Sequence, residues 1–439
     1  LTLTAKVAEN AKKNSILAAH YPPGNFFVPF MCFVVIYITD AINSVFVIKG
    51  DEIIVFDENN NKTILHKDVK DIFTLSDEAP DFYDVLKSRL RSVSKENIAL
   101  DLTGGLDSRF LLSNLLLNNI DFTASSAGFE SHDVQIPFEL SKVGDFNYFH
   151  YEHNPKEIID DIDDILYLSN GQYNILNCHR RYRLYLERIK KGSTLCICGH
   201  GGDAIRNNNW LALWPFYSKK NSDVSNFYYK KLKPKIYSHI FSGSSMEKYA
   251  LNFDEAILKK LKKYNRTPAR LAFDAVGYYF YLTTAVRTFD DKLIPTFTPL
   301  RDPDLVFAAS NLPIRMRNSH RLYRSSVTKA GIELARIKTD RGQNMIDSEW
   351  EAFKGDVVFV SDVFGRIYRR LRYYISGKNR RPTADHPEYM KYCRQLSQFK
   401  DAIIILKQLD LINSHVNEAD VPNSMVGAII AAGDVLKRL

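Results

Sequence analysis

The chain has 439 residues, of which 45% are hydrophobic and 25% are charged, and its formal net charge is +8. The length allows two or three domains, and the composition is that of an ordinary globular protein. The basic residues are scattered, as in residues 180–183 and 188–191. Solvated helix faces are therefore favoured over a nucleic-acid surface.

The five cysteines are few, and none of them forms a C-x-x-C pair. This usage fits a reducing cytoplasm better than a disulfide framework or a zinc site. The longest apolar run, residues 26–38, contains Pro29 and is shorter than the roughly 20 residues that span a bilayer. We therefore expect a cytoplasmic protein with no membrane span and no nucleic-acid partner.

Residues 1–75 are predicted to form a small N-terminal α+β unit. A helix is expected over 4–17, and apolar, β-branched runs predict strands at 33–38, 44–49 and 52–57. Turn residues separate these runs at 50–51 and 59–61, and residues 76–80 have the composition of a linker.

From residue 82 to about residue 174, helical and strand patterns alternate. Strands are expected at 97–100, 122–128 and 147–151, with a helix after each. In the first of these helices, Ser113, Asn114 and Asn118 fall off the apolar face. Alternating elements of this kind predict an α/β fold with a doubly wound, mostly parallel sheet.

The loop that follows the first of these strands reads D-L-T-G-G-L-D-S-R, residues 101–109, and opens directly into a helix. The first N–H groups of a helix lack internal partners and favour anions, and glycines let a phosphate approach the backbone. Two hydroxyls and a carboxylate suited to Mg²⁺ complete the set. The residues of this predicted phosphate site are Thr103, Gly104, Gly105, Asp107 and Ser108.

A second loop of this kind is predicted at residues 194–203, where an apolar strand ends in G-H-G-G-D. Gly199, Gly201 and Ala204 also match G-x-G-x-x-A, but the polar run that follows is unlike the apolar helix of a dinucleotide site. Asp203 and Asp107, at the ends of neighbouring strands, form a plausible Mg²⁺ pair.

Two smaller features of these strands have two readings each. Cys196 and Cys198 share one strand face and are favoured as core residues over metal ligands. Ala127 and Gly128, at the end of the second strand, are small enough to admit a flat adenine, and a packing requirement explains them equally well.

The first loop resembles the S-G-G-x-D-S loop of the PP-loop ATP pyrophosphatases, with Thr103 in place of the first serine. Together with G-H-G-G-D, it is similar to the synthetase domain of the asparagine synthetase family. Residues 295–308 resemble that family's P-F-L-D-x-x-L-V segment, and Arg324 and Lys338 stand where the family has an arginine and a catalytic lysine. The resemblance covers roughly residues 85–345.

The resemblance implies an adenine nucleotide alpha hydrolase-like sheet in an enzyme that uses ATP and Mg²⁺. Such an enzyme adenylates a carboxylate and lets an amine displace AMP. It implies that the first loop and Gly199 bind ATP and pyrophosphate, and that Asp107 and Asp203 bind Mg²⁺. Ala127 and Gly128 would then line the adenine pocket, with Asp133 nearby. Lys338 would stabilise charge on the phosphorus, although a solvated lysine at a helix end is an alternative.

The sequence departs from that family at its second loop and at its N-terminus. His200 replaces a glutamate that contacts the aspartyl intermediate, so aspartate is doubtful as the substrate. The histidine could serve as a base for the amine or could only shape the pocket. The family's glutaminase cysteine has no counterpart, and residues 1–75 resemble a cut-down remnant of that domain. Free glutamine is therefore not the expected amine source.

These departures leave several functions open. The leading one is macrolactam formation in a precursor peptide, because C-G-H-G-G-D resembles the loop of lasso-peptide cyclases, and partner proteins of a biosynthetic cluster would then be expected. Alternatives are amidation of a sugar acid, a non-enzymatic ATP-binding subunit, and sulfur transfer to tRNA through Cys178, Cys196 or Cys198.

The remaining chain divides at the end of the resemblance. The predicted domains are 1–75, a synthetase domain at 76–345, and a helical C-terminal region at 346–439. Within the last, residues 366–374 are basic and aromatic, and a solvated helix is favoured there over a partner surface.

Overall fold

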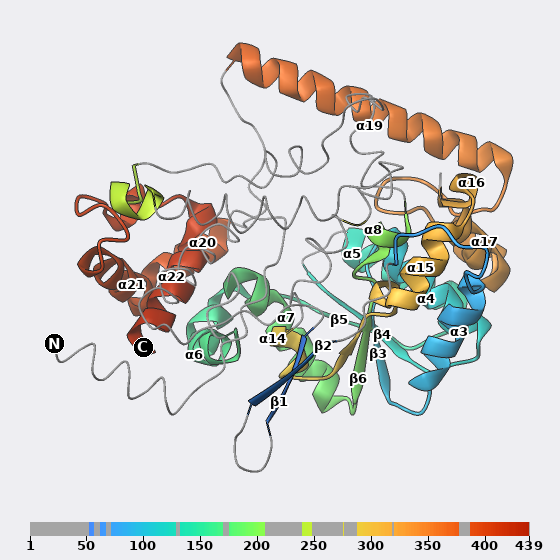
Figure 1. Cartoon of the computed structure of the whole chain (residues 1–439), viewed down its shortest axis with the longest axis horizontal. Helices are drawn as coiled ribbons and strands as arrows, with labels where there is room; N and C mark the ends of the chain where they lie inside the picture. The colour runs from blue at the N-terminus through green and yellow to red at the C-terminus, as the bar shows by residue number, and fades with distance from the viewer. Residues whose placement is uncertain are drawn as a thin grey trace.

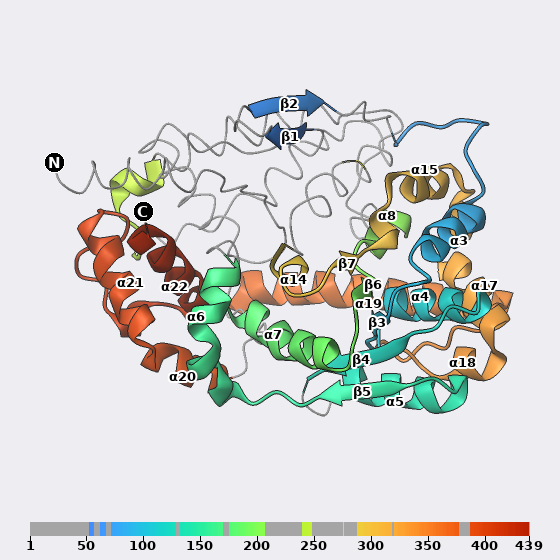
Figure 2. The same ribbon diagram turned by 90° about the horizontal axis from the view of Figure 1, so that it is seen from below.

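The computed structural model describes residues 52–56, 62–66, 72–128, 132–169, 175–206, 239–247, 275, 288–317, 320–376 and 387–438. The helix predicted at 4–17 and the strands predicted at 33–38 and 44–49 lie outside these ranges. Strands β1 (Glu52–Phe56) and β2 (Lys62–His66) form an antiparallel hairpin in which Ile54 faces Ile64. The strand predicted at 52–57 is therefore confirmed, and its partner β2 was not predicted. Figure 2 shows the hairpin apart from the main sheet.

The main sheet has five parallel strands in the order β5-β4-β3-β6-β7 (Figure 2). Its strands are β3 (Ile98–Asp101), β4 (Thr123–Ala127), β5 (Tyr148–Tyr151), β6 (Leu195–Cys198) and β7 (Thr296–Phe297). The predicted α/β fold is confirmed, and the predicted strands at 122–128 and 147–151 are each slightly longer than β4 and β5. The parallel arrangement brings the carboxyl ends of all five strands to one edge.

One face of the sheet is covered by α4 (Leu106–Leu117) and α5 (His132–Gly144). Helix α3 (Phe82–Ser92) joins the same core through a stripe at helical spacing that includes Leu86 and Leu90. The carboxylate of Asp81 starts α3 by accepting the N–H groups of Tyr83 and Asp84. The linker predicted at 76–80 thus ends at a helix cap.

The expectation that Ser113 and Asn114 lie off the buried face of α4 is wrong. Both are buried, and their side chains donate to the carbonyl of Phe110. The reason is that a second layer, α17 (Arg321–Ala330), packs against α4, where the rings of Phe110 and Tyr323 stack at 4.1 Å. Helix α4 is therefore enclosed on two sides.

The other face of the sheet is covered by α7 (Ile175–Lys190), and here the prediction of solvated basic residues is wrong for Arg188, whereas Lys190 and Lys191 are exposed. Arg188 is fully buried and donates to Ser125 of β4, to Cys196 of β6 and to Asp101 of β3. Arg181 pairs with the buried Asp290, and Arg183 pairs with Asp161 through two hydrogen bonds. Arg188 is thus fully buried with an acidic partner from another part of the chain, while Arg181 and Arg183 are half-buried in their ion pairs.

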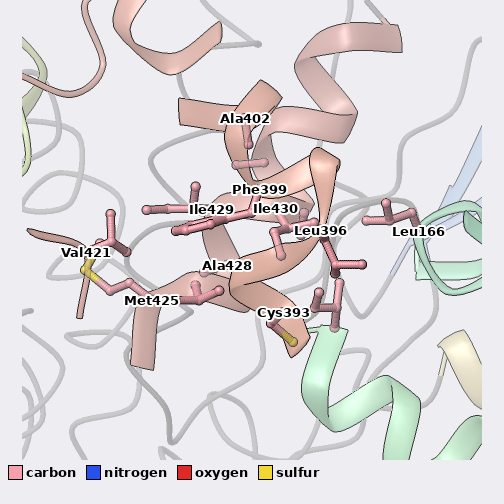
Figure 3. Close-up of a cluster of buried hydrophobic side chains, with 14 of the residues drawn as sticks. Leu166, Cys393, Leu396, Phe399, Ala402, Val421, Met425, Ala428, Ile429 and Ile430 are labelled. Carbon is pink, nitrogen blue, oxygen red and sulfur yellow. The ribbon is translucent and has the colours of Figure 1, made fainter. Parts of the chain in front are cut away.

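The C-terminal region is helical, as predicted. Helices α20 (Pro387–Gln395), α21 (Ser397–Gln408) and α22 (Asn423–Arg438) form a second core with α6 (Ile158–Ser169) and α7. Figure 3 shows part of this core, in which Phe399, Ala428 and Ile429 belong to the same cluster as Leu166 of α6. These helices lie at the end of the molecule opposite α3 and α4 (Figure 1). The domain boundaries remain predictions.

The longest helix, α19 (Glu349–Ser376), extends across the molecule in Figure 1. Shorter elements connect the layers: 3-10 turns η1 (Pro155–Glu157), η4 (Pro299–Arg301) and η6 (Glu418–Asp420), and helices α8 (Gly202–Ile205), α14 (Thr288–Asp291), α15 (Pro303–Asn311), α16 (Ile314–Arg317) and α18 (Ile332–Arg336). Within the described part of the chain, none of the helices has the length and apolar character needed to cross a membrane.

Candidate functional site

The strand order places a topological switch point between β3 and β6. These two strands are neighbours although β4 and β5 separate them in the chain, and Asp101 at the end of β3 lies opposite Cys198 at the end of β6. The loops that follow them therefore leave the sheet side by side. In open α/β sheets, ligands bind in the crevice at this point.

The first loop, residues 101–109, includes the first turn of α4 and is braced by its own hydroxyls. The Ser108 hydroxyl accepts the N–H of Thr103 at 3.1 Å and lies 3.1 Å from the Thr103 hydroxyl, which in turn accepts the N–H of Gly105 at 3.2 Å. Gly105 is the N-cap residue of α4, and no side chain caps this helix. The positive end of α4 is thus left for an anion.

The two glycines of this loop differ in whether packing explains the absence of a side chain. A Cβ on Gly104 would lie 2.9 Å from the carbonyl oxygen of His132, and the Gly104 N–H donates to Asp133 at 3.0 Å. Close approach of α5 therefore requires this glycine. A Cβ on Gly105 would meet only the Thr103 hydroxyl at 3.3 Å. Of the two, only Gly105 has no packing reason to be glycine.

The glycines of the second loop let it pack against α4. A Cβ on Gly199 would lie 2.7 Å from the backbone nitrogen of Ser108, and one on Gly202 would overlap the Asp107 carboxylate. Gly201 has a φ of 102°, and a Cβ there would overlap Arg301. Close packing against α4 therefore explains why residue 199 is glycine, although the family resemblance implied a role for Gly199 in nucleotide binding.

The two aspartates predicted to bind Mg²⁺ lie together. The Nη2 atom of Arg206 donates to Asp107 Oδ2 at 2.7 Å and to Asp203 Oδ1 at 2.8 Å. Burial raises the pKa of Asp107 and the Asp203 charge raises it further, while Arg206 opposes both effects. The side chain of Asp203 is 57% exposed, compared with 24% for Asp107.

This pair fits a magnesium ion that also binds phosphate. The Oδ1 atom of Asp107 is buried and has no hydrogen-bond partner of normal geometry. Among the described residues, no three or more His, Cys, Asp or Glu side chains lie close enough together to hold a metal ion by themselves. Mg²⁺ usually takes one or two carboxylates and completes its shell with substrate phosphates and water. Asp107 and Asp203 are the residues that would hold it.

The segment that carries Lys338 is fixed against the first loop by a residue that the sequence did not single out. Arg109, buried in α4, donates to the carbonyls of Ile337 and Lys338. The Asp340 N–H donates to the carbonyl of Gly104 at 3.0 Å. Lys338 itself is exposed. The signal for such a contact was a charged residue in the first turns of α4, directly before the apolar run 110–112.

A second missed residue is Arg317, which holds the second loop. This buried side chain donates to the carbonyls of Ala204 and Ile205 in α8. Arg324, which the family resemblance had marked, is also buried and donates to the carbonyls of Asn344 and Ile346. Arg317 therefore fixes the backbone of α8, which carries Asp203, and Arg324 fixes the backbone of residues 344–346.

The remaining predicted residues lie along the same edge of the sheet. His200 is half-buried in the second loop, next to Gly199. Ala127 and Gly128 are half-buried at the end of β4, one strand away from β3, and the Gly128 N–H donates to Tyr151 of β5. The structure thus brings the predicted site residues to one edge of the sheet.

Comparison with models of known protein families found no match for this chain, and comparison with curated proteins found no matching sequence. Support for a function therefore comes from the residues of the site and from the motifs that they form.

Proposed function

We propose that the chain is an ATP- and Mg²⁺-dependent synthetase of the PP-loop type, which forms an amide through an acyl-adenylate. The observation that carries this proposal is the meeting of two glycine–aspartate loops at the switch point of a parallel sheet. One loop leaves the positive end of α4 uncapped, and the second adds a carboxylate beside that of Asp107. The motif resemblance of both loops to asparagine synthetases supports the same chemistry.

In the first step, a substrate carboxylate oxygen attacks the α-phosphorus of ATP. The bond from this phosphorus to the oxygen that bridges it to the β-phosphorus breaks, and pyrophosphate leaves with the electron pair. Bound Mg²⁺ would supply charge neutralisation to the phosphates. The Lys338 segment is fixed against the first loop, so the lysine could stabilise charge that builds up on the departing pyrophosphate.

In the second step, an amine attacks the acyl carbon of the adenylate. The carbon–oxygen bond to AMP breaks, AMP leaves, and the amine loses one proton. We assign His200 to accept that proton, because it lies in the same loop as Asp203 and is half-buried.

The substrate assigned to this reaction is a precursor peptide, whose Asp or Glu side chain is joined to the peptide's own α-amine. The resemblance of residues 198–203 to the lasso-cyclase loop supports this choice. An intramolecular amine also gains from proximity, with effective molarities that can reach about 10⁵ M or more.

The cysteines required for sulfur transfer have the wrong properties. Burial raises the pKa values of Cys178 and Cys196 to about 12, so neither would be a thiolate at neutral pH. Cys198 is also buried. This observation favours amide formation over sulfur chemistry.

The test is to incubate the protein with Mg²⁺, ATP and one of two kinds of carboxylate. The first kind is a synthetic peptide with a free α-amine and an internal Asp or Glu. The second kind is a uronic acid, supplied together with a separate amine. AMP and pyrophosphate should form, and added hydroxylamine should trap the acyl-adenylate as a hydroxamate. Production of ADP and phosphate would contradict the proposal. Turnover of uronic acids alone would indicate sugar-acid amidation. ATP binding without AMP formation would favour a non-enzymatic ATP-binding subunit.

A further inference from the structure

Arg206 occupies the centre of the candidate site, although no motif pointed to it. Its side chain is 9% exposed, and its Nη2 atom contacts carboxylates from both loops. Its backbone N–H donates to Gly202, and Arg317 fixes the two carbonyls that precede it. The guanidinium therefore has a defined position.

The single positive charge of Arg206 is shared between the two carboxylates of Asp107 and Asp203. Burial alone would lower the pKa of Arg206, but Asp107 and Asp203 raise it above its ordinary value, so the guanidinium remains charged. Without it, two carboxylates would face each other and repel. Arg206 thus holds the two loops in register before any metal ion is present.

The same charge has a consequence for the metal site. A divalent cation on Asp107 and Asp203 would lie within a few ångströms of the guanidinium, where like charges repel strongly in a partly buried site. The anionic phosphates of ATP or pyrophosphate would offset that repulsion. Asp107 and Asp203 are the carboxylates that would hold the cation, and the same two carboxylates accept the Arg206 hydrogen bonds.

We propose that Arg206 is a positioning residue that couples cation binding to the polyphosphate: it holds Asp107 and Asp203 together, and its charge keeps a divalent cation out until the phosphates arrive. This inference rests on the proposed function for the identity of the polyphosphate. In this proposal, Arg206 determines that the polyphosphate binds to the site before the cation does.

The test measures Mn²⁺ binding to the full chain by electron paramagnetic resonance, without nucleotide. Arg206→Gln should bind Mn²⁺ about tenfold more tightly than the wild type, because one opposing charge is removed. Saturating inorganic pyrophosphate should tighten Mn²⁺ binding about tenfold in the wild type and clearly less in Arg206→Gln. A purely structural role for Arg206 predicts weaker binding in the variant, not tighter.

Two further variants localise the effect. Adding Asp203→Asn to Arg206→Gln should abolish the gain, because it removes one of the two carboxylates. Arg89→Gln, which removes an exposed arginine paired with Asp302 and Asp304, should leave Mn²⁺ binding unchanged.

The result that overturns the proposal is an Arg206→Gln protein that folds and binds Mn²⁺ no more tightly than the wild type. If that variant does not fold, Arg206→Lys decides: it keeps the charge and should bind Mn²⁺ alone within about threefold of the wild type, whereas tenfold tighter binding would contradict exclusion by charge. Failure to form AMP with any carboxylate would overturn the proposed function and leave the Mn²⁺ comparison intact.

Discussion

The two loops at the switch point are held in opposite ways. The first is braced mainly from within, by the hydroxyls of Thr103 and Ser108, with one further hydrogen bond to Asp133 of α5. The second has backbone hydrogen bonds between Gly202 and Gly199 and between Ala204 and Gly201, and it is also held from outside, by Arg317 and by close packing of its glycines on α4 and on Arg301. Side-chain hydroxyls thus fix the first loop, whereas packing against neighbouring elements fixes the second, which carries Asp203.

The difference extends to the two carboxylates. Asp107 is enclosed between the loops, whereas more than half of the Asp203 side chain is exposed. If both bind one cation, the enclosed carboxylate should contribute more, because water competes less for it and its charge is less screened.

The largest expected effect is therefore at Asp107. Asp107→Asn should reduce AMP formation about a thousandfold, equivalent to about 4 kcal/mol of transition-state stabilisation, whereas Asp203→Asn should reduce it less. Initial rates of pyrophosphate release measure both. Asp304→Asn, at an exposed carboxylate on α15, is the control and should be nearly neutral. Equal losses at positions 107 and 203 would remove the distinction between an enclosed and an exposed ligand.

Local pattern accounts for what the sequence could predict of the site. The first loop is built from residues 103–108 and their hydrogen bonds to one another, so its motif carries its own structure. The order β3, α4, β4, α5 likewise follows from alternating local patterns, which favour parallel pairing.

What the sequence could not supply are partners far along the chain. Arg109 contacts residues 228 and 229 positions away, and Arg317 contacts carbonyls 112 and 113 positions away. The same holds for Arg188 of α7, which was predicted to be solvated. Its partners Asp101 and Ser125 lie on strands β3 and β4. From sequence alone, a basic residue in an amphipathic helix is predicted to be solvated, because the acceptor that the fold places beside it is distant in the sequence.

The next effect tests whether the first loop and the Lys338 segment act as one unit. Lys338→Met should reduce AMP formation about a hundredfold, the cost of losing one charge stabiliser. Stability should not change, because Lys338 is exposed. The matched control is Arg336→Met, another exposed cation two residues upstream, paired with Glu333. Equal rates for both variants would identify Lys338 as a solvated lysine.

A smaller effect tests the docking of the second loop. Gly199→Ala should lower the free energy of unfolding by about 1–3 kcal/mol, because its Cβ meets the backbone of α4, which cannot rotate away. Urea unfolding measures the change. Gly243→Ala, whose Cβ would meet no atom within 4 Å, should change stability by about 0.5 kcal/mol or less. Similar values for the two variants would show that the loops do not need this close contact.

A test of the first loop itself comes from its two adjacent glycines, of which Gly105 should show the smaller change in stability. Gly104→Ala should destabilise the protein by about 1–3 kcal/mol, because α5 occupies the space of its Cβ. Gly105→Ala should change stability by less than about 1 kcal/mol, because its φ of −78° suits alanine and only a hydroxyl lies near.

If the uncapped end of α4 is a phosphate site, the same small methyl group should weaken binding of ATP about tenfold, since it stands between the backbone and the ligand. Calorimetric titration of ATP with Mg²⁺ into Gly105→Ala and wild type measures this directly, with matched urea curves as the fold control. Unchanged affinity in a normally folded Gly105→Ala protein would show that no phosphate approaches this backbone, and the first loop would then be an ordinary strand-to-helix turn.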